Sequence, residues 1–454
     1  QFGSADRYEV SEDGLTYTFH IRAEAKWSNG DPVTAHDFAW SHMRMLHPET
    51  AAEYSYQLYY VTGAKKFNDG EVKVGDAVEV ELDSRPKKLQ LFPRGEILRG
   101  KLVKMDGPKD DPVYTVEIGG KRRRFAKTVL GGGIEKCLWV LLDFAKEVGI
   151  HALNDRELQF TLVNPTPYFP KLMAFYPLFP VHRGCVEEHG YPAFTKPDKL
   201  VNNGAFRLQF RRIRDRIRLV KSETYWNRDQ VKVNVVDALS VSSEHTALNL
   251  YLSGKADWIT AIPITMIPEL QAKYEDQKHK DFNPQPFLAI YFYRVNVTKP
   301  PMNNPKVREA LNLALDKQRI VDAVVKAGEL PALSFVPPGI EGYVPALCGE
   351  HDPDRARELL AEAGYPGGEG FPSVEILYNT SDSHRSIAEF IQAEWKKKLG
   401  IEIRLKKHAW ASFLETTRNL DYAVARAGWT GDYVDPNTFL DMWVSGGANN
   451  QTGW

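Results

Sequence analysis

The chain has 454 residues, of which 43% are hydrophobic, so it can form two or three domains with sizeable cores. Its 58 basic and 59 acidic side chains give a net charge of −1, which argues against a polyanion as the main partner. Cys137, Cys185 and Cys348 allow at most one disulfide, and no apolar run approaches the roughly 20 residues that a membrane-spanning helix requires.

The beginning of the chain predicts a strand, a turn and a helix. Apolar and polar residues alternate over 17–21, as in a half-buried strand. The following segment 27–32, Trp-Ser-Asn-Gly-Asp-Pro, contains Asn-Gly and Asp-Pro pairs that are typical of a loop. Thr34 is a candidate helix N-cap, and Asp37 three residues later is close to a capping box.

Residues 71–133 differ from their flanks, because several short strand patterns follow one another without a helix between them. A run of three glycines at 131–133 closes the segment. Four or five short strands within about 60 residues predict a small closed β-barrel. The strand patterns lie at 72–82, 98–105, 113–118 and 124–129.

The predicted barrel is moderately basic. Residues 71–133 contain 14 Lys and Arg against 10 Asp and Glu, and Lys121, Arg122, Arg123 and Arg124 form one continuous cluster. This cluster is either a solvated hairpin turn or a contact site for an anionic surface, and both interpretations stay open.

After the barrel, the sequence returns to alternating strand and helix patterns. Residues 201–220 alternate like a hairpin, with Asn203-Gly204 at its head. A second unit begins at about 287. Strands that alternate with helices predict a largely parallel sheet with helical crossovers. The strands of this unit are predicted at 289–297, 374–378 and 401–405, and its main helices at 306–315 and 381–399.

The sequence carries no phosphate-binding loop, no nucleophile elbow and no His-Glu-x-x-His motif. His182, Cys185 and His189 are near one another in the chain, but they have no fourth ligand and match no standard zinc spacing. We therefore predict no catalytic residue, no metal site and no cofactor.

One group of residues near the end of the chain suits ligand binding. Small and apolar residues over 422–427 predict a strand that leads to Trp429 and Asp432, and ligands of α/β sheets bind beyond the carboxyl ends of strands. Trp429 offers a flat apolar surface, Asp432 a charge that matches an ammonium, and Arg426 a guanidinium that can hold a carboxylate. A zwitterionic peptide needs all three. Alternatively, Asp432 caps the turn before Pro436 and pairs with Arg426.

Eight spaced segments resemble, in the same order, the peptide, oligopeptide and nickel class of ABC-transporter solute-binding proteins. The resemblance covers nearly the whole chain outside residues 71 to about 140. It implies an α/β, two-lobed periplasmic-binding-protein-like fold (type II, large cluster) with an inserted SH3-like β-barrel. The segments are 27–38, 164–169, 203–206, 225–226, 247–251, 299–302, 307–311 and 425–429.

The resemblance also implies a domain organisation. Residues 1–70 and 141–286 would form the first lobe, residues 71–140 the barrel inserted at a surface loop, and residues 287–454 the second lobe. Chains of the family extend beyond both ends of this sequence. We therefore expect a piece of a longer protein, without the C-terminal part of the family fold.

The function implied by the resemblance is binding without catalysis. A monomer in the periplasm or another extracytoplasmic space would capture a short peptide between two lobes and deliver it to a membrane permease and ATPase. Nucleic acid is not an expected partner, and a membrane anchor at a missing N-terminus is an option. Other ligands of the same fold (a nickel chelate, heme or an oligosaccharide), a peptide-sensing role, and an interaction role for the barrel stay open.

The oligopeptide-binding branch is the most similar, and it implies roles for single residues. Asp432 would pair with the peptide ammonium, Arg426 would meet the carboxylate, and Trp429 and Thr430 would line the groove for the peptide backbone. The remaining predicted contacts are Trp410 and Asn379 as pocket-lining residues, and Tyr54 on the opposing lobe.

The sequence departs from the family pattern at two pocket positions. Thr417 stands where the family has a second arginine, and Arg294 stands where it has a glutamate. Arg294 would either receive a ligand carboxylate or pair with an acidic neighbour inside the protein. Because of these two departures, the family pattern does not define the length and the charge of the ligand that this chain prefers.

Overall fold

The computed structural model describes residues 3–84, 94–128, 132–274 and 287–454. The chain divides into two compact units, Gln1–Ser240 and Val241–Trp454, which we call unit 1 and unit 2. The predicted lobe boundary at 286–287 lies later in the chain than this division, and the assignment of segments to lobes stays a prediction. Within the described part of the chain, none of the helices combines the length and apolar character that a membrane crossing needs.

Unit 1 contains a four-stranded antiparallel sheet in the order β1-β2-β9-β8. The predicted N-cap begins the helix that packs on this sheet, where the Asp37 side chain accepts a hydrogen bond from the Thr34 backbone amide over 2.8 Å. Buried aromatic rings such as Phe160 and Phe169 fill the space beneath it. The elements are β1 (Ala5–Val10), β2 (Thr16–Ile21), α1 (Ala35–Leu46), α2 (Ala64–Asp69), α3 (Phe144–Glu147), β8 (Ile150–Ala152), β9 (Glu157–Thr161), α4 (Phe169–Leu172) and α5 (Arg183–His189).

A three-stranded antiparallel sheet, β10-β11-β12, ends unit 1. Asn203-Gly204 comes directly before its first strand, and the link between the first two strands lies at 213–215. The predicted hairpin is therefore confirmed, with Asn203-Gly204 at its head. The strands are β10 (Phe206–Arg212), β11 (Arg216–Lys221) and β12 (Val235–Leu239).

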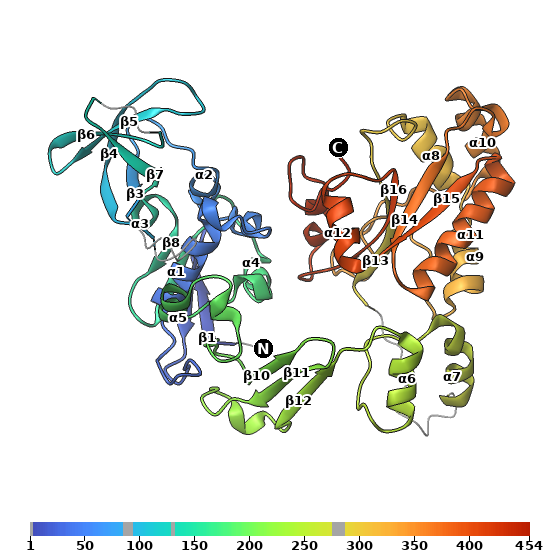
Figure 1. Ribbon diagram of the computed structural model, residues 1–454, viewed down its shortest axis with the longest axis horizontal. Coiled ribbons are helices and arrows are strands. Elements are labelled where there is room, and N and C mark those ends of the chain that lie inside the picture. The colour runs from blue at the N-terminus through green and yellow to red at the C-terminus, as the bar shows by residue number, and fades with distance from the viewer. Residues whose placement is uncertain (1–2, 85–93, 129–131, 275–286) are drawn as a thin grey trace. The chain divides into compact units, whose positions relative to one another are not determined.

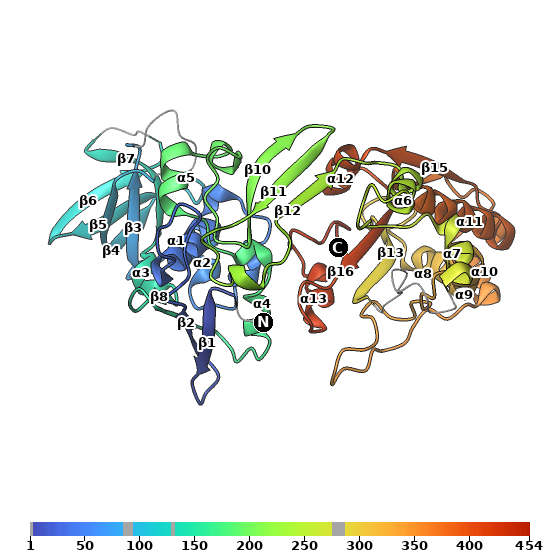
Figure 2. The ribbon, with the colours of Figure 1, turned by 90° about the horizontal axis from the view of Figure 1, so that it is seen from below.

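The predicted small barrel is confirmed as a closed barrel of five strands at one end of unit 1 (Figures 1 and 2). Its last strand begins after the glycine run, so that the barrel closes by pairing this strand with both β3 and β6. The interior is apolar and includes Val80, Leu102, Val116 and Phe125. The strands are β3 (Ala77–Leu82), β4 (Ile97–Asp106), β5 (Val113–Ile118), β6 (Lys121–Ala126) and β7 (Ile134–Leu142).

Unit 2 is built on a four-stranded sheet in the order β13-β16-β14-β15. The pairings of β14 with β15 and with β16 are parallel, as expected, whereas β13 runs antiparallel to β16. One long helix connects β14 to β15, and a shorter one connects β15 to β16. The strands are β13 (Ala289–Val295), β14 (Val374–Asn379), β15 (Ile403–His408) and β16 (Val424–Thr430).

Helices cover both faces of this sheet, with α8, α10 and α11 on one side and α12 on the other (Figure 1). Trp395 on α11 lies in the larger core and donates from Nε1 to the Leu311 carbonyl of α8 over 2.9 Å. Phe413 on α12 packs with Leu377 on the other face. The helices are α6 (Glu244–Leu252), α7 (Ile267–Tyr274), α8 (Pro305–Leu313), α9 (Lys317–Ile320), α10 (Pro353–Glu362), α11 (Asp382–Leu399), α12 (Trp410–Arg418) and α13 (Asn437–Leu440).

Candidate functional site

The carboxyl end of β16 leads into a short loop that is fixed by hydrogen bonds to α13. Trp429 donates from Nε1 to the Thr438 carbonyl over 2.7 Å, and the Asp432 backbone amide donates to Thr438 Oγ1 over 2.9 Å. The Gly431 amide donates to the Leu288 carbonyl beside β13 over 2.8 Å. Because these bonds hold the loop, the backbone from which the Asp432 side chain extends is fixed before any ligand arrives.

The Asp432 side chain is half-buried, and one of its carboxylate oxygens has no partner in the described part of the chain. Its Oδ2 atom is closed off from solvent and receives no hydrogen bond from the residues that the structure describes. Burial raises the pKa of Asp432 to about 6. An isolated buried carboxylate is unfavourable, and a cation that reaches it removes that penalty. The site therefore suits an ammonium group.

The alternative that Asp432 serves as a turn cap paired with Arg426 is not supported. Among the described residues, no hydrogen bond or ion pair joins the Asp432 side chain to Arg426. The cap belongs to Asp435 instead, whose Oδ1 accepts from the Asn437 amide over 2.9 Å. Asp432 is thus free of the structural role that would have explained it.

Arg426 lies on β16, and its side chain reaches Asn379 at the end of the neighbouring strand β14. Its Nη1 donates to Asn379 Oδ1 over 3.1 Å, and its guanidinium carbon lies 5.3 Å from the centre of the Tyr291 ring. Its Nε is buried and has no acceptor among the described residues. A guanidinium held by a neutral amide and a ring keeps donors available for a carboxylate.

The prediction missed His384, which belongs to the same neighbourhood. Its Nδ1 lies 3.3 Å from the Tyr291 hydroxyl, in the first turn of α11. Burial and, to a smaller extent, the charge of Arg426 lower the pKa of His384 to about 4, so the imidazole is neutral at pH 7. Its place just beyond the carboxyl end of β14 was a signal that could have identified it.

Arg294 does not join this group. Tyr293 pairs with Arg426 in the register of β13 and β16, and Arg294, the next residue along, therefore points to the opposite face of the sheet. It donates from Nη1 to the Gln451 side-chain oxygen, while its Nε is buried without an acceptor among the described residues. Burial lowers the pKa of Arg294. The expected acidic neighbour is absent from the described ion pairs.

The other predicted contacts of unit 2 lie at strand ends. Trp410 follows β15, is 55% exposed and stacks on Phe413 with ring centres 5.8 Å apart. Thr430 is the last residue of β16 and is exposed. Because β14, β15 and β16 run parallel, their carboxyl ends lie at one edge. Asn379, Trp410, Thr430 and the loop that carries Asp432 therefore share that edge.

Thr417, the other departure from the family pattern, is a buried residue of α12. Its Oγ1 donates to the Leu414 carbonyl over 3.0 Å. The threonine thus bonds within its own helix and is closed off from solvent, which leaves no polar atom for a ligand.

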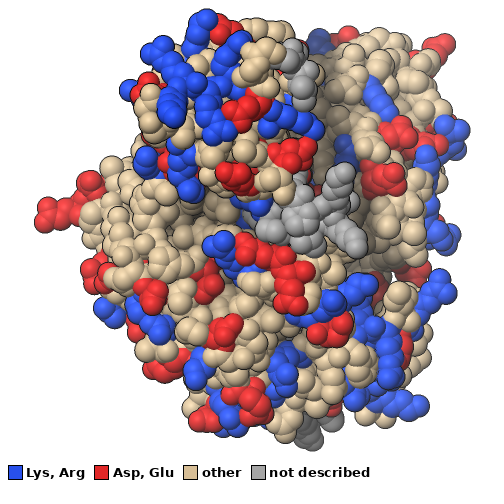
Figure 3. All heavy atoms as spheres, turned by 60° about the vertical axis from the view of Figure 1, so that its left-hand side comes forward, with Lys and Arg blue, Asp and Glu red and all other residues tan. Residues whose placement is uncertain are grey.

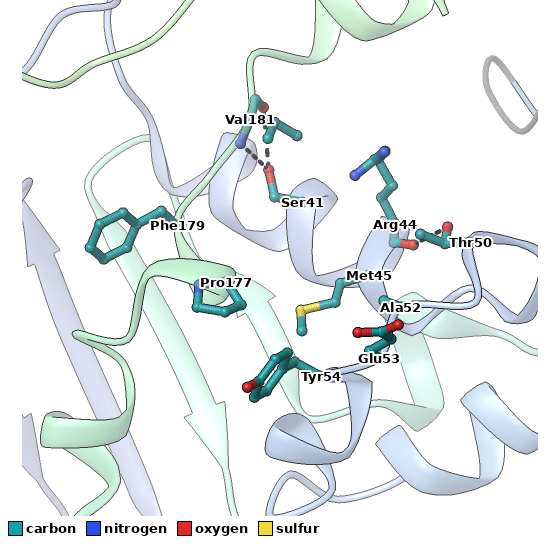
Figure 4. A pocket seen from close by; sticks show the side chains of 10 residues that line it. All are labelled: Ser41, Arg44, Met45, Thr50, Ala52, Glu53, Tyr54, Pro177, Phe179 and Val181. Atoms are coloured by element: carbon teal, nitrogen blue, oxygen red, sulfur yellow. Dashed lines mark hydrogen bonds between the residues drawn. The ribbon is translucent and has the colours of Figure 1, made fainter. Parts of the chain in front are cut away.

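Tyr54 belongs to unit 1, where it lines a small cavity of about 220 Å³ (Figure 4). Its ring stacks on Tyr56 at 5.9 Å and meets Phe175 edge-on at 5.2 Å. Ser41 on α1 closes another part of the cavity, because its Oγ accepts from the Val181 amide over 3.0 Å. The remaining lining residues are Arg44, Met45, Thr50, Ala52, Glu53, Pro177 and Phe179.

The cysteine and histidine cluster of unit 1 has structural contacts. Cys185 Sγ lies 3.0 Å from the Lys199 carbonyl, and His182 caps α5 through the Cys185 amide and meets Asp31 at 3.1 Å. All three cysteines of the chain are free. In the part of the chain that the structure describes, no three His, Cys, Asp or Glu side chains are grouped so as to hold a metal ion.

Comparison with known proteins gives a consistent result over almost the full chain. The family described as bacterial extracellular solute-binding proteins, family 5 Middle, matches residues 3–451. Oligopeptide-binding protein OppA of Bacillus subtilis is 30% identical over 464 residues, which cover 100% of this chain and 71% of that protein. Periplasmic oligopeptide-binding protein OppA of Escherichia coli is 32% identical over 455 residues, which cover 99% of this chain and 70% of that protein.

A solved structure is similar over the same extent. OppA of Haemophilus influenzae, in complex with RPPGFSPFR, matches with a TM-score of 0.76 and 27% identity, covering 100% of this chain and 76% of that one. The two-lobed fold expected from the sequence is that of these neighbours. The chain thus spans roughly seven tenths of the length of the proteins it matches.

Proposed function

This chain belongs to family 5 of the bacterial extracellular solute-binding proteins, and from that premise we propose that it captures short peptides and delivers them to an ABC importer in the membrane. Proteins of this family bind and do not catalyse, and the relatives work outside the cytoplasm. We extend both properties to this chain. A membrane anchor and the insertion of the barrel into a first lobe stay predictions from the resemblance.

The observation that carries the proposal is the unpartnered Asp432 carboxylate. A charge that is buried without a counter-ion lowers the stability of the ligand-free protein, and such groups are retained where a ligand supplies the counter-ion. The α-ammonium of a peptide has the charge and the donors that Oδ2 requires. Asp432 would thereby anchor the N-terminus of the ligand at the carboxyl end of β16.

Arg426 supplies the opposite charge. Its side chain has donors left after the bond to Asn379, and the neutral His384 next to Tyr291 can add a further hydrogen bond. A carboxylate of the peptide would complete this cluster. Recognition through the two charged ends requires few specific contacts to the side chains of the peptide. The protein can therefore bind peptides of different sequence.

The aromatic and hydroxyl groups at the same edge would line the groove between the two ends. Trp429 is fixed by its bond to Thr438, whereas Trp410 is exposed and can adapt. Thr430 could pair with the main chain of a peptide. We keep Tyr54 as a candidate contact, and Arg294 only as a candidate for an anionic group of a ligand that reaches the opposite face of the sheet.

Calorimetry with two forms of trialanine, free and N-acetylated, tests the proposal. The free peptide should bind, and N-acetylation should weaken binding as strongly as Asp432→Ala does, by roughly 2–5 kcal/mol, since either change leaves one charge buried alone. Asp421→Asn, which removes an acid that is 79% exposed, is the control and should leave affinity unchanged. Equal affinity for free and acetylated peptides would show that Asp432 is not the anchor.

Other ligands of the fold are separated by a second measurement. Native mass spectrometry of the protein as purified would show a carried molecule by its mass. A set of short peptides supports the proposal. A nickel chelate, heme or an oligosaccharide in their place would contradict it.

A further inference from the structure

Peptide capture leaves the inserted barrel without a role, and the placement of its charges suggests one. The acidic side chains of β3 point toward the rest of unit 1. Arg94 donates to Glu79 over 2.7 Å and to Glu81 over 3.0 Å, and His47 at the end of α1 lies 3.2 Å from the same Glu81 oxygen. His47, Glu79 and Glu81 are all buried. Through His47, this network ties the barrel to the rest of unit 1.

The basic side chains of the barrel lie on other strands. Lys101, Glu117 and Arg122 stand opposite one another across β4, β5 and β6, and Lys104, Thr115 and Arg124 form a parallel row. Residues in register share a face of the sheet. Lys101, Lys104, Arg122 and Arg124, which we call the outer basic face, are all exposed.

The outer basic face is turned away from the attachment of the barrel. The barrel contacts α3 through β3 and α2 through β7, and β5 is separated from both of these strands by a neighbour on each side. Lys and Arg side chains gather at the top of Figure 3, over the barrel. Two acids of the insert, Glu79 and Glu81, are thus buried on the attached side, whereas the four basic residues of the outer basic face are exposed.

Few acids of the barrel neutralise this face. Lys104 pairs with Asp106 at 2.9 Å, and Arg122 reaches Glu117 only at 3.8 Å. Lys101 and Arg124 form no ion pair among the residues described. Two rows of basic side chains on a sheet form an extended array rather than the convergent set of donors that a small anion requires.

We propose that the outer basic face docks on the surface of an anionic phospholipid bilayer. An array of this kind matches a plane of headgroup phosphates, and each Lys or Arg near such a surface strengthens binding about fivefold. Nucleic acid fits less well, because Tyr114 and Phe125, the aromatic residues of β4–β6, are buried and offer no ring to bases. The location beside a membrane rests on the proposed delivery to an importer.

Docking would keep the protein close to the membrane without anchoring it. The attraction falls off within about 8 Å at physiological salt, so binding is reversible and depends on the orientation of the barrel. The buried contact between Glu81 and His47 supplies that orientation, since it ties β3 of the barrel to the end of α1.

Co-sedimentation of the full chain with lipid vesicles tests the proposal. The protein should bind vesicles of phosphatidylcholine with about 30% phosphatidylglycerol, whose surface potential is negative, and not vesicles of phosphatidylcholine alone. Replacing all four residues of the outer basic face by Gln should lower the partition coefficient at least about fiftyfold. Peptide affinity, measured by calorimetry on the same sample, should not change.

The matched control removes the same charge elsewhere. Arg207, Arg211, Lys397 and Lys407 are exposed and have no ion pair among the described residues. Their quadruple Gln variant should keep vesicle binding within about threefold. The double variant Lys101→Gln/Arg124→Gln breaks no ion pair and should still lose more than tenfold, which separates docking from any defect in folding.

Three outcomes would overturn the proposal: no sedimentation of the unmodified protein with anionic vesicles, equal sedimentation with neutral vesicles, or an equal loss in the control variant. Binding that persists in 0.5 M salt, where the Debye length is only about 4 Å, would also contradict it. Because vesicle binding and peptide binding are read separately, failure of one leaves the other intact.

Discussion

The backbone amide of Asp432 donates to the buried Oγ1 of Thr438 over 2.9 Å. The carbonyl of the same threonine accepts from Trp429 Nε1 over 2.7 Å. One residue of α13 thus holds both the aromatic wall and the acidic anchor. It leaves the Asp432 carboxylate without a hydrogen bond at Oδ2 from any described residue. The anchor is positioned by the main chain and stays chemically available.

Thr438→Val should therefore weaken peptide binding although Thr438 is not itself a proposed ligand contact. Valine keeps the shape and the carbonyl but loses the acceptor for the Asp432 amide, and we expect about a tenfold loss of affinity, or about 1–1.5 kcal/mol. Thr438→Ser keeps the oxygen and should restore most of the affinity. If free and N-acetylated trialanine lose affinity equally in the valine variant, the threonine does not act through the anchor.

Asp432→Asn should stabilise the ligand-free protein while it abolishes binding. The pKa of Asp432 is raised in the folded state to about 6 from an ordinary 3.8, so the folded state holds the proton more tightly than the unfolded state. Stability is then greatest below pH 4, falls as the pH rises toward 6 and stays low above it. At pH 7 asparagine should recover about 1–2 kcal/mol. Thermal unfolding at pH 4.5 and pH 7 measures the loss of stability with pH in the unmodified protein and the gain in stability in the variant.

The same ionisation makes peptide binding depend on pH. An ammonium pairs with the charged carboxylate, so below pH 6 binding must first expel a proton from Asp432, and the dissociation constant should rise up to about tenfold per pH unit. In Asp432→Asn this dependence should vanish along with most of the affinity. A flat profile between pH 4.5 and 7 in the unmodified protein would contradict the anchoring role.

Arg426→Ala should discriminate between peptides by their C-terminus. It removes a guanidinium whose Nε has no acceptor in the described structure, so trialanine with a free carboxylate should lose at least about tenfold in affinity. C-amidated trialanine should change less than threefold. Arg404→Ala, an exposed arginine of β15 with a surface partner at 3.4 Å, is the control. Equal losses for both peptides would mean that Arg426 supports the fold of the site and not the carboxylate.

Local patterns were sufficient to predict much of this molecule from its sequence. Turn residues and alternation identified the barrel, and the run of small residues before Trp429 identified β16, because both patterns depend on neighbours in the chain. The sequence predicted both Arg294 and Arg426 as ligand contacts, because it does not show how β13 and β16 pair. The antiparallel pairing of β13 with β16 puts the two on opposite faces. His384 was missed because its environment depends on Tyr291, 93 residues away.

The Arg94 network was also beyond the reach of sequence patterns, since it joins residues that packing alone brings together. Arg94→Ala should be strongly destabilising, by about 3–5 kcal/mol, because it leaves Glu79 and Glu81 buried with fewer partners. Arg122→Ala, at an exposed pair, should cost less than about 0.5 kcal/mol. Amide hydrogen exchange measured in β3 and β7 would show the loss of stability in the barrel. Exchange in unit 2 should stay unchanged.

The network also predicts where acid begins to release the barrel. Burial alone would raise the pKa of Glu81, but the hydrogen bond to His47 and the charge of Arg94 outweigh it and lower the pKa to about 2 from an ordinary 4.5. A lowered pKa means that the stabilisation is complete above pH 4.5 and is lost as the pH falls toward 2. Exchange protection in β3 should decline over this range. In Glu81→Gln it should be low already at pH 7 and vary little with acid, because the charge that Arg94 and His47 oppose is gone.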